Sequence, residues 1–307
     1  MLAIVAPGQG AQKPGMLTSW LELDGAAEAL AQMSERAHLD LTRLGTEASA
    51  EEIKDTAVTQ PLVVASALLA ARYLQIPSTA AVAGHSVGEL AAASIAGVFA
   101  DLDAVALAAA RGQAMSAACA LTPTGMSAVM GGDTDAVLAA LAELDLVGAN
   151  VNGGGQIVAA GPLDALEQLK AEPPAGVRII PLPVAGAFHT SFMATAEHAL
   201  REHVAGLQAQ DPTHVLLTNS DGTVIASGPA YLQLLVAQVT HPVRWDSCMQ
   251  TLAGLGVTGV LELPPAGTLV GLVKRDLKGV ATMALKTPAD LDAAAAFAAE
   301  HAGVKQA

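Results

Sequence analysis

The feature that most constrains how this chain folds is the segment at residues 84–88, which reads Gly-His-Ser-Val-Gly. The preceding residues 78–83 (STAAVA) are small or β-branched and favour a buried strand, whereas residues 87–97 (VGELAAASIAG) are rich in alanine, contain no proline and favour a helix. A serine at a sharp turn from strand to helix is lifted clear of the sheet, and flanking glycines permit a turn in which a Cβ would clash. Matches of five residues also occur by chance, but this context favours Ser86 as a nucleophile.

The composition sets limits on the class of protein. Of the 307 residues, 52% are hydrophobic and 14% are charged, which allows a large core in about two domains or in one domain with an inserted module. The formal net charge of −14 argues against nucleic acid or an anionic membrane as a general partner. Residues 1–8 lack a basic region and predict a first strand rather than a signal peptide, and no stretch predicts a transmembrane helix. Cys119 and Cys248 lie in no metal-binding spacing, so we expect a reduced, cytoplasmic protein without a metal site.

The order of predicted elements indicates the fold class. Along most of the chain strands alternate with helices, which is typical of an α/β protein with a mainly parallel sheet. Residues 125–181 instead show a strand, helix, strand, strand, helix and strand, the order of a ferredoxin-like module. We therefore predict a large, hydrolase-like α/β subdomain formed by residues 1–123 and 190–307, with an inserted ferredoxin-like small subdomain at residues 124–189.

Two ionisable residues are candidates for a site. Arg111 is the one basic residue of a helix predicted over residues 101–120, and its neighbours are mostly small and apolar. A buried guanidinium is costly unless it meets a carboxylate, so an internal Asp or Glu and a substrate carboxylate are both open as its partner. His189 follows the small module where the chain returns to the large one, and a residue at such a junction lines the cleft between modules.

Two glutamines each have two interpretations. Gln9 lies in a glycine-rich loop after the first strand; the loop lacks the pattern of a phosphate loop, and a close backbone approach and a plain turn are equally open. Gln60 opens a helix predicted over residues 60–73 with Pro61 in its first turn, where the missing N–H costs nothing. The residues alone favour a capping role for Gln60 over a place in a cleft.

Five segments taken together resemble one family. They are residues 7–10 (PGQG), 84–89 (GHSVGE), 111–112 (RG) and 186–189 (GAFH), and Gln238 ahead of residues 242–245 (PVRW). Their order is similar to that in malonyl-CoA:acyl carrier protein transacylases, especially the stand-alone bacterial enzymes of fatty-acid and polyketide synthesis. Each motif is weak by itself, but five in register are specific and extend over essentially the whole chain. Residues 264–268 (PPAGT) depart from the family, which more often has Gly-Pro-Gly in this loop.

The resemblance implies a catalytic role for several residues. Ser86 would be the nucleophile and His189 the general base and acid. The backbone N–H groups of Gln9 and Val87 would form the oxyanion hole. Residues 181–196 contain no acid, so we expect a Ser–His dyad without a carboxylate. The resemblance points to the backbone carbonyl of Gln238, near the end of a predicted helix, as the acceptor of the histidine Nδ1–H.

The resemblance also implies how the acyl group is recognised. Arg111 would pair with the free carboxylate of a malonyl group, and Gln60 would lie nearby. Phe188, directly before the histidine, matches the members that select malonyl, whereas members with branched substrates usually carry a serine there.

The implied reaction is a ping-pong transfer. The malonyl group passes from malonyl-CoA to Ser86 and then to the phosphopantetheine thiol of an acyl carrier protein, which supplies extender units for fatty-acid or polyketide synthesis. The resemblance implies no cofactor, and we expect a monomer with malonyl-CoA and the carrier as partners. Lys274, Arg275 and Lys278 form the densest basic cluster, which is either a docking site for an acidic carrier or a solvated helix end.

Three other functions share part of this pattern. A serine esterase or thioesterase expects an acid between nucleophile and histidine, but Asp133, Asp145 and Asp164 in that interval fall in the small module. A malonyl-transfer subunit of a malonate decarboxylase would share the same residues. A non-catalytic docking subunit is disfavoured because Ser86 and His189 both occur in context.

Overall fold

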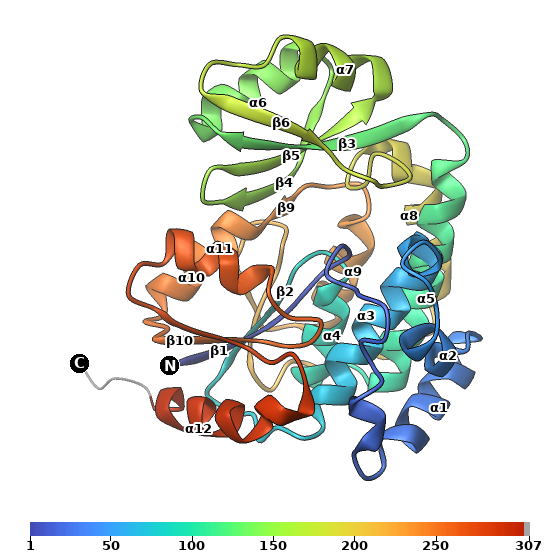
Figure 1. Ribbon diagram of the computed structural model, residues 1–307, viewed down its shortest axis with the longest axis vertical. Helices are drawn as coiled ribbons and strands as arrows, with labels where there is room; N and C mark the ends of the chain where they lie inside the picture. The colour runs from blue at the N-terminus through green and yellow to red at the C-terminus, as the bar shows by residue number, and fades with distance from the viewer. Residues whose placement is uncertain (304–307) are drawn as a thin grey trace.

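The computed structural model describes residues 1–303, whose strands form two separate sheets (Figure 1). The larger sheet has the order β11-β10-β1-β2-β7-β8. Its strands are β1 (Leu2–Ala6), β2 (Ala81–Gly84), β7 (Val215–Leu217), β8 (Val224–Ile225), β10 (Gly259–Glu262) and β11 (Ala281–Ala284). Neighbouring strands are parallel except β7 and β8, so the mainly parallel sheet predicted from the sequence is confirmed.

Strand β1 lies inside this sheet and is buried on both faces. Leu2 and Ile4 belong to one apolar core, whereas Ala3 and Val5 belong to a second core on the opposite face. A parallel strand covered on both sides has no solvated face, which is why its sequence is a continuous apolar run rather than an alternation.

Helices supply the rest of both cores. The first core contains residues of α1 (Ala26–Ala37), α2 (Leu41–Thr46), α3 (Thr56–Ala71), α4 (Gly88–Ile95), α5 (Asp101–Cys119), α8 (Ala194–Val204), α9 (Gly228–Ala237) and α12 (Leu291–His301). The second contains residues of α10 (Trp245–Gly254) and α11 (Leu269–Asp276). Short 3₁₀ turns occur at η1 (Trp20–Glu22), η2 (Glu52–Lys54), η3 (Ser191–Met193) and η4 (Pro288–Asp290). Within residues 1–303, none of the helices is long and apolar enough to cross a bilayer.

The second sheet lies at one end of the molecule, with α6 and α7 on its outer side (Figure 1). It has the order β6-β3-β5-β4-β9. Its elements are β3 (Thr124–Gly131), α6 (Thr134–Glu143), β4 (Val147–Gly153), β5 (Gln156–Pro162), α7 (Leu163–Ala171), β6 (Val177–Pro181) and β9 (Val243–Arg244). The pairs among the first four strands are antiparallel, which gives the ferredoxin-like arrangement expected from the sequence.

Strand β9 was not expected from the sequence. It comes from the later part of the chain and pairs in parallel with β4, with Asn150 opposite Val243 and Val151 opposite Arg244. The small sheet therefore includes a strand that lies outside residues 124–189. The inner face of this sheet is buried as well, because Met126 and Val158 belong to the first core of the large part.

Helix α3 begins earlier than the sequence predicted. It starts at Thr56, and the side chain of Asp55 accepts a hydrogen bond from the backbone N–H of Ala57. The prediction that Pro61 lies in the first turn is therefore wrong, and its missing N–H costs the helix one backbone bond. Gln60 accordingly lies inside the helix rather than at its cap.

The loop at residues 264–268 connects β10 to α11 and contains a cis peptide bond between Pro264 and Pro265. The buried carboxylate of Glu262 accepts hydrogen bonds from the backbone N–H groups of Gly267, Leu269 and Val270, at 2.9, 3.0 and 3.0 Å. Leu269 and Val270 are the first two residues of α11, where backbone N–H groups lack intrahelical partners, and Gly267 lies just before the helix. Glu262 thus fixes the position of the helix whose first turn borders the cleft described below.

Candidate active site

Ser86 lies between β2 and α4 in a strained backbone conformation, with φ of +52°. An added Cβ at Gly84 would lie 2.1 Å from the carbonyl oxygen of Gly88, and one at Gly88 would lie 2.3 Å from that of Ala6. Both distances are far inside van der Waals contact, so only glycine fits at either position. The turn predicted from the sequence is therefore present, and it presents the Ser86 side chain at the carboxyl edge of the sheet.

Asn219 holds this turn in place. Its Oδ1 accepts the backbone N–H of Ser86 at 2.8 Å, and its Nδ2 donates to the carbonyl of Gly84 at 2.8 Å. Asn219 was not among the residues expected at the site. The available signal was its place shortly after β7, because β7 is the neighbour of β2 and the carboxyl ends of parallel strands meet at one edge.

His189 contacts Ser86 on one side and Gln238 on the other. Its Nε2 lies 2.7 Å from the Ser86 Oγ, and its Nδ1 lies 2.8 Å from the backbone carbonyl oxygen of Gln238. A carbonyl only accepts, so Nδ1 carries the proton and Nε2 is free to accept the serine proton. Among residues 1–303, no Asp or Glu oxygen hydrogen-bonds to this imidazole.

The environment of His189 keeps it neutral. The residue is 3% exposed. Burial and, to a lesser extent, the positive charge of Arg111 lower the pKa of His189 to about 3, although hydrogen bonds with the backbone of Gln238 and His241 oppose this shift. At neutral pH the imidazole is therefore the free base, which is the form that can take a proton.

Arg111 extends from α5 towards the nucleophile and is 3% exposed. Its guanidinium donates to Gln60 Oε1 and to Gln238 Oε1, each at 2.8 Å, and one nitrogen lies 3.3 Å from the Ser86 Oγ. The internal carboxylate considered from the sequence is not in direct contact, since no ion pair of Arg111 occurs within residues 1–303. Burial lowers the pKa of Arg111 to about 10 and the charge of Glu89 opposes this, so the group remains a cation at neutral pH.

A buried carboxylate faces Arg111 across one amide. The Gln238 Nε2 donates to Glu89 Oε2 while its Oε1 accepts from Arg111. Glu89 also accepts from the backbone N–H of Asn219 at 2.7 Å and from the Tyr231 hydroxyl at 3.1 Å. Burial raises the pKa of Glu89 to about 7, and these donors oppose the shift. Glu89 belongs to the motif at residues 84–89, but its position there predicted no function for it.

Ser86, His189 and Arg111 border a cleft of about 190 Å³ between the two sheets. The predicted residues that line it are Gln9, Gln60, Ser86, Val87, Arg111, Phe188 and His189. Gln238 lies behind Arg111, outside this cleft. The backbone N–H groups of Gln9 and Val87 donate to no acceptor within residues 1–303, so both remain available to a ligand.

The small sheet adds polar groups that the sequence analysis missed. Asn150 and Asn152 of β4 line the cleft, and Asn152 Oδ1 lies 2.8 Å from His85 Nε2. The available signal was the spacing of two, which places both amides on one face of an otherwise mostly apolar strand.

An α/β fold that presents a serine beside a neutral histidine in this way is typical of enzymes that pass an acyl group through a serine ester. Comparisons with known proteins are more specific. A family model described as the acyl transferase domain matches residues 4–297. The malonyl CoA-acyl carrier protein transacylase of Mycobacterium tuberculosis is 56% identical over 297 residues, covering 95% of this chain and 98% of that protein.

Solved structures agree with the sequence matches. The crystal structure of MCAT from Mycobacterium tuberculosis has a TM-score of 0.92 at 55% identity and covers 96% of this chain and 99% of that chain. A malonyl-transacylase solved in complex with a type II PKS acyl-carrier protein has a TM-score of 0.89 at 29% identity, covering 96% and 99%. The chain belongs to the malonyl-CoA:acyl carrier protein transacylase family and is an acyltransferase.

Proposed function

We propose that this enzyme transfers a malonyl group from malonyl-CoA to the phosphopantetheine thiol of an acyl carrier protein through a malonyl ester of Ser86. The observation that carries the proposal is the buried guanidinium of Arg111, which has no direct carboxylate partner within residues 1–303 and lies 3.3 Å from the Ser86 Oγ. In a malonyl thioester one methylene separates the reacting carbonyl from the carboxylate. A cation this close to the nucleophile therefore suits a very short acyl chain that ends in a negative charge.

The first half-reaction acylates the enzyme. The Ser86 Oγ attacks the thioester carbonyl while His189 Nε2 takes its proton, and the oxyanion is held by the N–H groups of Gln9 and Val87. When the intermediate collapses, the carbon–sulfur bond breaks and the CoA sulfur leaves with the proton from His189. The carbonyl of Gln238 stabilises the imidazolium less than a carboxylate would, which suffices because a thiolate is a good leaving group.

The second half-reaction runs the same steps with a carrier thiol. His189 takes the proton of the pantetheine thiol, the sulfur attacks the malonyl ester, and Ser86 leaves with that proton. Water competes for the same ester. The ion pair between Arg111 and the malonyl carboxylate would hold the acyl group in place, and a mostly apolar cleft would admit little water (Met115, Met126, Val158, Leu182 and Phe188 line it).

Selectivity for malonyl rests on three side chains in this proposal. Arg111 pairs with the carboxylate, and Gln60 orients the guanidinium through its Oε1. Among the described residues 1–303, the Nε2 of Gln60 has only the Met115 sulfur, at 3.4 Å, as its partner, so it is available as a second donor to the substrate. Phe188 is 7% exposed and borders the cleft, where its ring would occupy the space that an α-methyl group requires.

The remaining expectations from the sequence form part of the same proposal. We propose that residues 1–123 and 190–303 form the large subdomain and residues 124–189 the small one, with β9 added to the small sheet. The last four residues of the predicted range 190–307 lie outside the residues that the structure describes. The enzyme works without a metal or cofactor, in the cytoplasm, and supplies fatty-acid or polyketide synthesis. A relative was solved with a type II PKS acyl-carrier protein, which supports a carrier of that kind as the acceptor.

The test separates transfer from hydrolysis. The protein is incubated with malonyl-CoA, and the peptide that contains Ser86 is examined by mass spectrometry before and after addition of a carrier protein bearing phosphopantetheine. We expect a malonyl adduct that disappears as malonyl-carrier forms, and no adduct in Ser86→Ala. Free malonate without transfer to the carrier would instead identify an esterase.

A further inference from the structure

The acceptor of His189 lies in a turn rather than within a helix. Helix α9 ends at Ala237, and strand β9 begins at Val243. The carbonyl of Gln238 accepts from His189 Nδ1 at 2.8 Å and from the backbone N–H of His241 at 3.2 Å. The direction of this carbonyl therefore depends on the conformation of residues 237–241.

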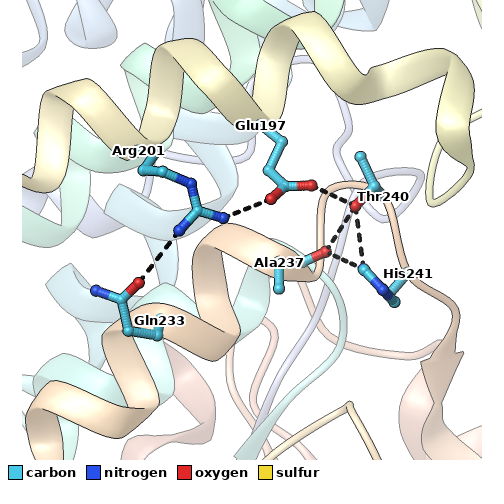
Figure 2. Close-up of polar contacts among 6 residues, drawn as sticks. All are labelled: Glu197, Arg201, Gln233, Ala237, Thr240 and His241. Carbon is cyan, nitrogen blue, oxygen red and sulfur yellow. Dashed lines mark hydrogen bonds and ion pairs between the residues drawn. The ribbon is translucent and has the colours of Figure 1, made fainter.

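Side chains outside the cleft hold this turn (Figure 2). The Thr240 hydroxyl donates to Glu197 Oε2 at 2.5 Å. The His241 Nδ1 lies 2.8 Å from the carbonyl oxygen of Ala237 and donates to it, which provides a partner for one of the last carbonyls of α9. The turn is thus bound to a neighbouring helix through Thr240 and to its own helix through His241.

The same carboxylate reaches a second point on α9. Arg201, one turn further along α8, donates to Glu197 Oε1 at 2.6 Å and to Gln233 Oε1 of α9 at 3.3 Å, as Figure 2 shows. The side chain of Arg201 is 51% exposed and that of Glu197 is 21% exposed. An ion pair with one exposed partner adds little stability, so the more sheltered contact between Thr240 and Glu197 is the one that holds the turn.

Glu197 is ionised in this environment. Partial burial raises its pKa, but hydrogen bonds from Thr240 and Arg201, together with the charge of Arg201, outweigh burial and leave the pKa below its ordinary value. A hydroxyl that donates to an ionised carboxylate forms a shorter and stronger bond than one that donates to a neutral group.

The hydrogen bond between Thr240 and Glu197 joins two segments that both lead to the catalytic histidine. After His189 the chain passes through η3 and enters α8 at Ala194, and Glu197 lies in the first turn of α8. Gln238 lies in the turn at residues 237–241, which the hydrogen bond from Thr240 to Glu197 holds. The bond between Glu197 and Thr240 therefore ties the segment that carries the imidazole to the segment that carries its acceptor.

We propose that Glu197 and Thr240 are positioning residues that keep the Gln238 carbonyl aligned with the Nδ1–H of His189. The inference rests on the proposed malonyl transfer and adds two residues to its machinery that touch neither substrate nor Ser86. Without the bond, the turn relaxes, the carbonyl points less well at Nδ1, and the imidazole is less well oriented towards the serine hydroxyl.

The experiment compares Thr240→Val, which removes the hydroxyl at nearly constant volume, with Thr240→Ser, which keeps it. The rate constant of Ser86 acylation by malonyl-CoA is measured in single turnovers, and the concentration giving half the maximal rate is measured alongside. We expect Thr240→Val to lower the maximal rate about tenfold, the loss of one charge-assisted hydrogen bond, with the half-saturating concentration unchanged. Thr240→Ser should stay close to the wild type.

Further measurements exclude a purely structural role. Glu197→Gln keeps an acceptor but removes the charge, so the rate constant of Ser86 acylation should fall several-fold. Glu202→Gln, on the exposed side of the same helix, serves as the matched control and should acylate at the wild-type rate. In proton NMR, the downfield signal of the His189 Nδ1–H, assigned by its absence in His189→Gln, should move or broaden in Thr240→Val.

Three outcomes would overturn the inference: a wild-type acylation rate in Thr240→Val, an equal loss in Thr240→Ser, or an effect confined to the half-saturating concentration. If Thr240→Val does not fold, the rate of Glu197→Gln relative to Glu202→Gln decides the matter. A wild-type protein that malonyl-CoA does not acylate would refute the proposed function itself, which is a different result.

Discussion

Replacing Arg111 by alanine removes the only cation that lines the cleft beside Ser86 within residues 1–303. Arg111 is 3% exposed, and its guanidinium donates to two amide oxygens, those of Gln60 and Gln238, so the group is oriented and largely dehydrated before substrate binds. A malonyl carboxylate that binds to Arg111 gives up its water and gains a fixed, charge-assisted ion pair. In Arg111→Ala the same carboxylate would lose its water without gaining this partner.

The expected magnitude follows from the partners that remain. Removing one member of a buried charge pair costs about 2–5 kcal/mol, which corresponds to roughly 30-fold to several thousand-fold in kcat/KM. Gln60 Nε2, whose only partner within the described part of the chain is the Met115 sulfur, can still donate to the malonyl carboxylate. We therefore expect a loss nearer the lower end, about a hundredfold, for malonyl-CoA.

Acetyl-CoA provides the internal comparison because it has no carboxylate. Its turnover by Arg111→Ala should be unchanged or higher, since loss of the positive charge also removes one influence that lowers the pKa of His189. The assay is steady-state kinetics with both thioesters for Arg111→Ala and Arg111→Lys. Lysine keeps the charge but cannot form the bidentate pair of a guanidinium, so the loss of kcat/KM for malonyl-CoA in Arg111→Lys should be intermediate. If both substrates fall by the same factor in Arg111→Ala, the residue is structural and the recognition argument fails.

Three further predictions concern pH, side-chain size and charge. The pKa of His189 is lowered to about 3 from its ordinary 6.5, so between these pH values the unfolded chain binds a proton at this residue and the native state does not. The free energy of unfolding should therefore fall as pH drops from 6.5 towards 3, and denaturant titrations should show a smaller fall for His189→Gln. Phe188→Ser should raise the kcat/KM ratio of methylmalonyl-CoA to malonyl-CoA about tenfold, and an unchanged ratio would argue against a steric role. Reversing the charges of Lys274 and Arg275 should raise the KM for the carrier, most at low salt, while the KM for malonyl-CoA stays constant; equal effects on both would place the docking surface elsewhere.

The parts of the fold that could be predicted are those encoded by neighbouring residues. The turn at Ser86 can be predicted because the small residues before it, the alanines after it and the two glycines around it all favour the same local geometry. The ferredoxin-like module is readable for the same reason, since each strand and helix has its own hydrophobic pattern. The absence of acids near His189 likewise made a backbone acceptor the expected one.

The parts that could not be predicted depend on contacts between distant segments. Glu89 meets Asn219, Tyr231 and Gln238 only after the sheet and α9 have assembled, and no local pattern specifies that register. Strand β9 contains two residues, too few for a periodic signal. Pro61 resembles a first-turn proline, which favours a capping position for Gln60, whereas the residues before Gln60 extend the helix back to Thr56.

Strand β9 has a consequence for chimeras between relatives. A small module transplanted with cuts at residues 124 and 189 would leave β9 behind, so the pairing of Asn150 with Val243 would have to form between residues of two parents. A poor fit between β4 and β9 would also affect the active site, because β9 directly follows the turn that presents the Gln238 carbonyl to His189. We therefore expect active chimeras mainly when residues 243–244 come from the same parent as the small module.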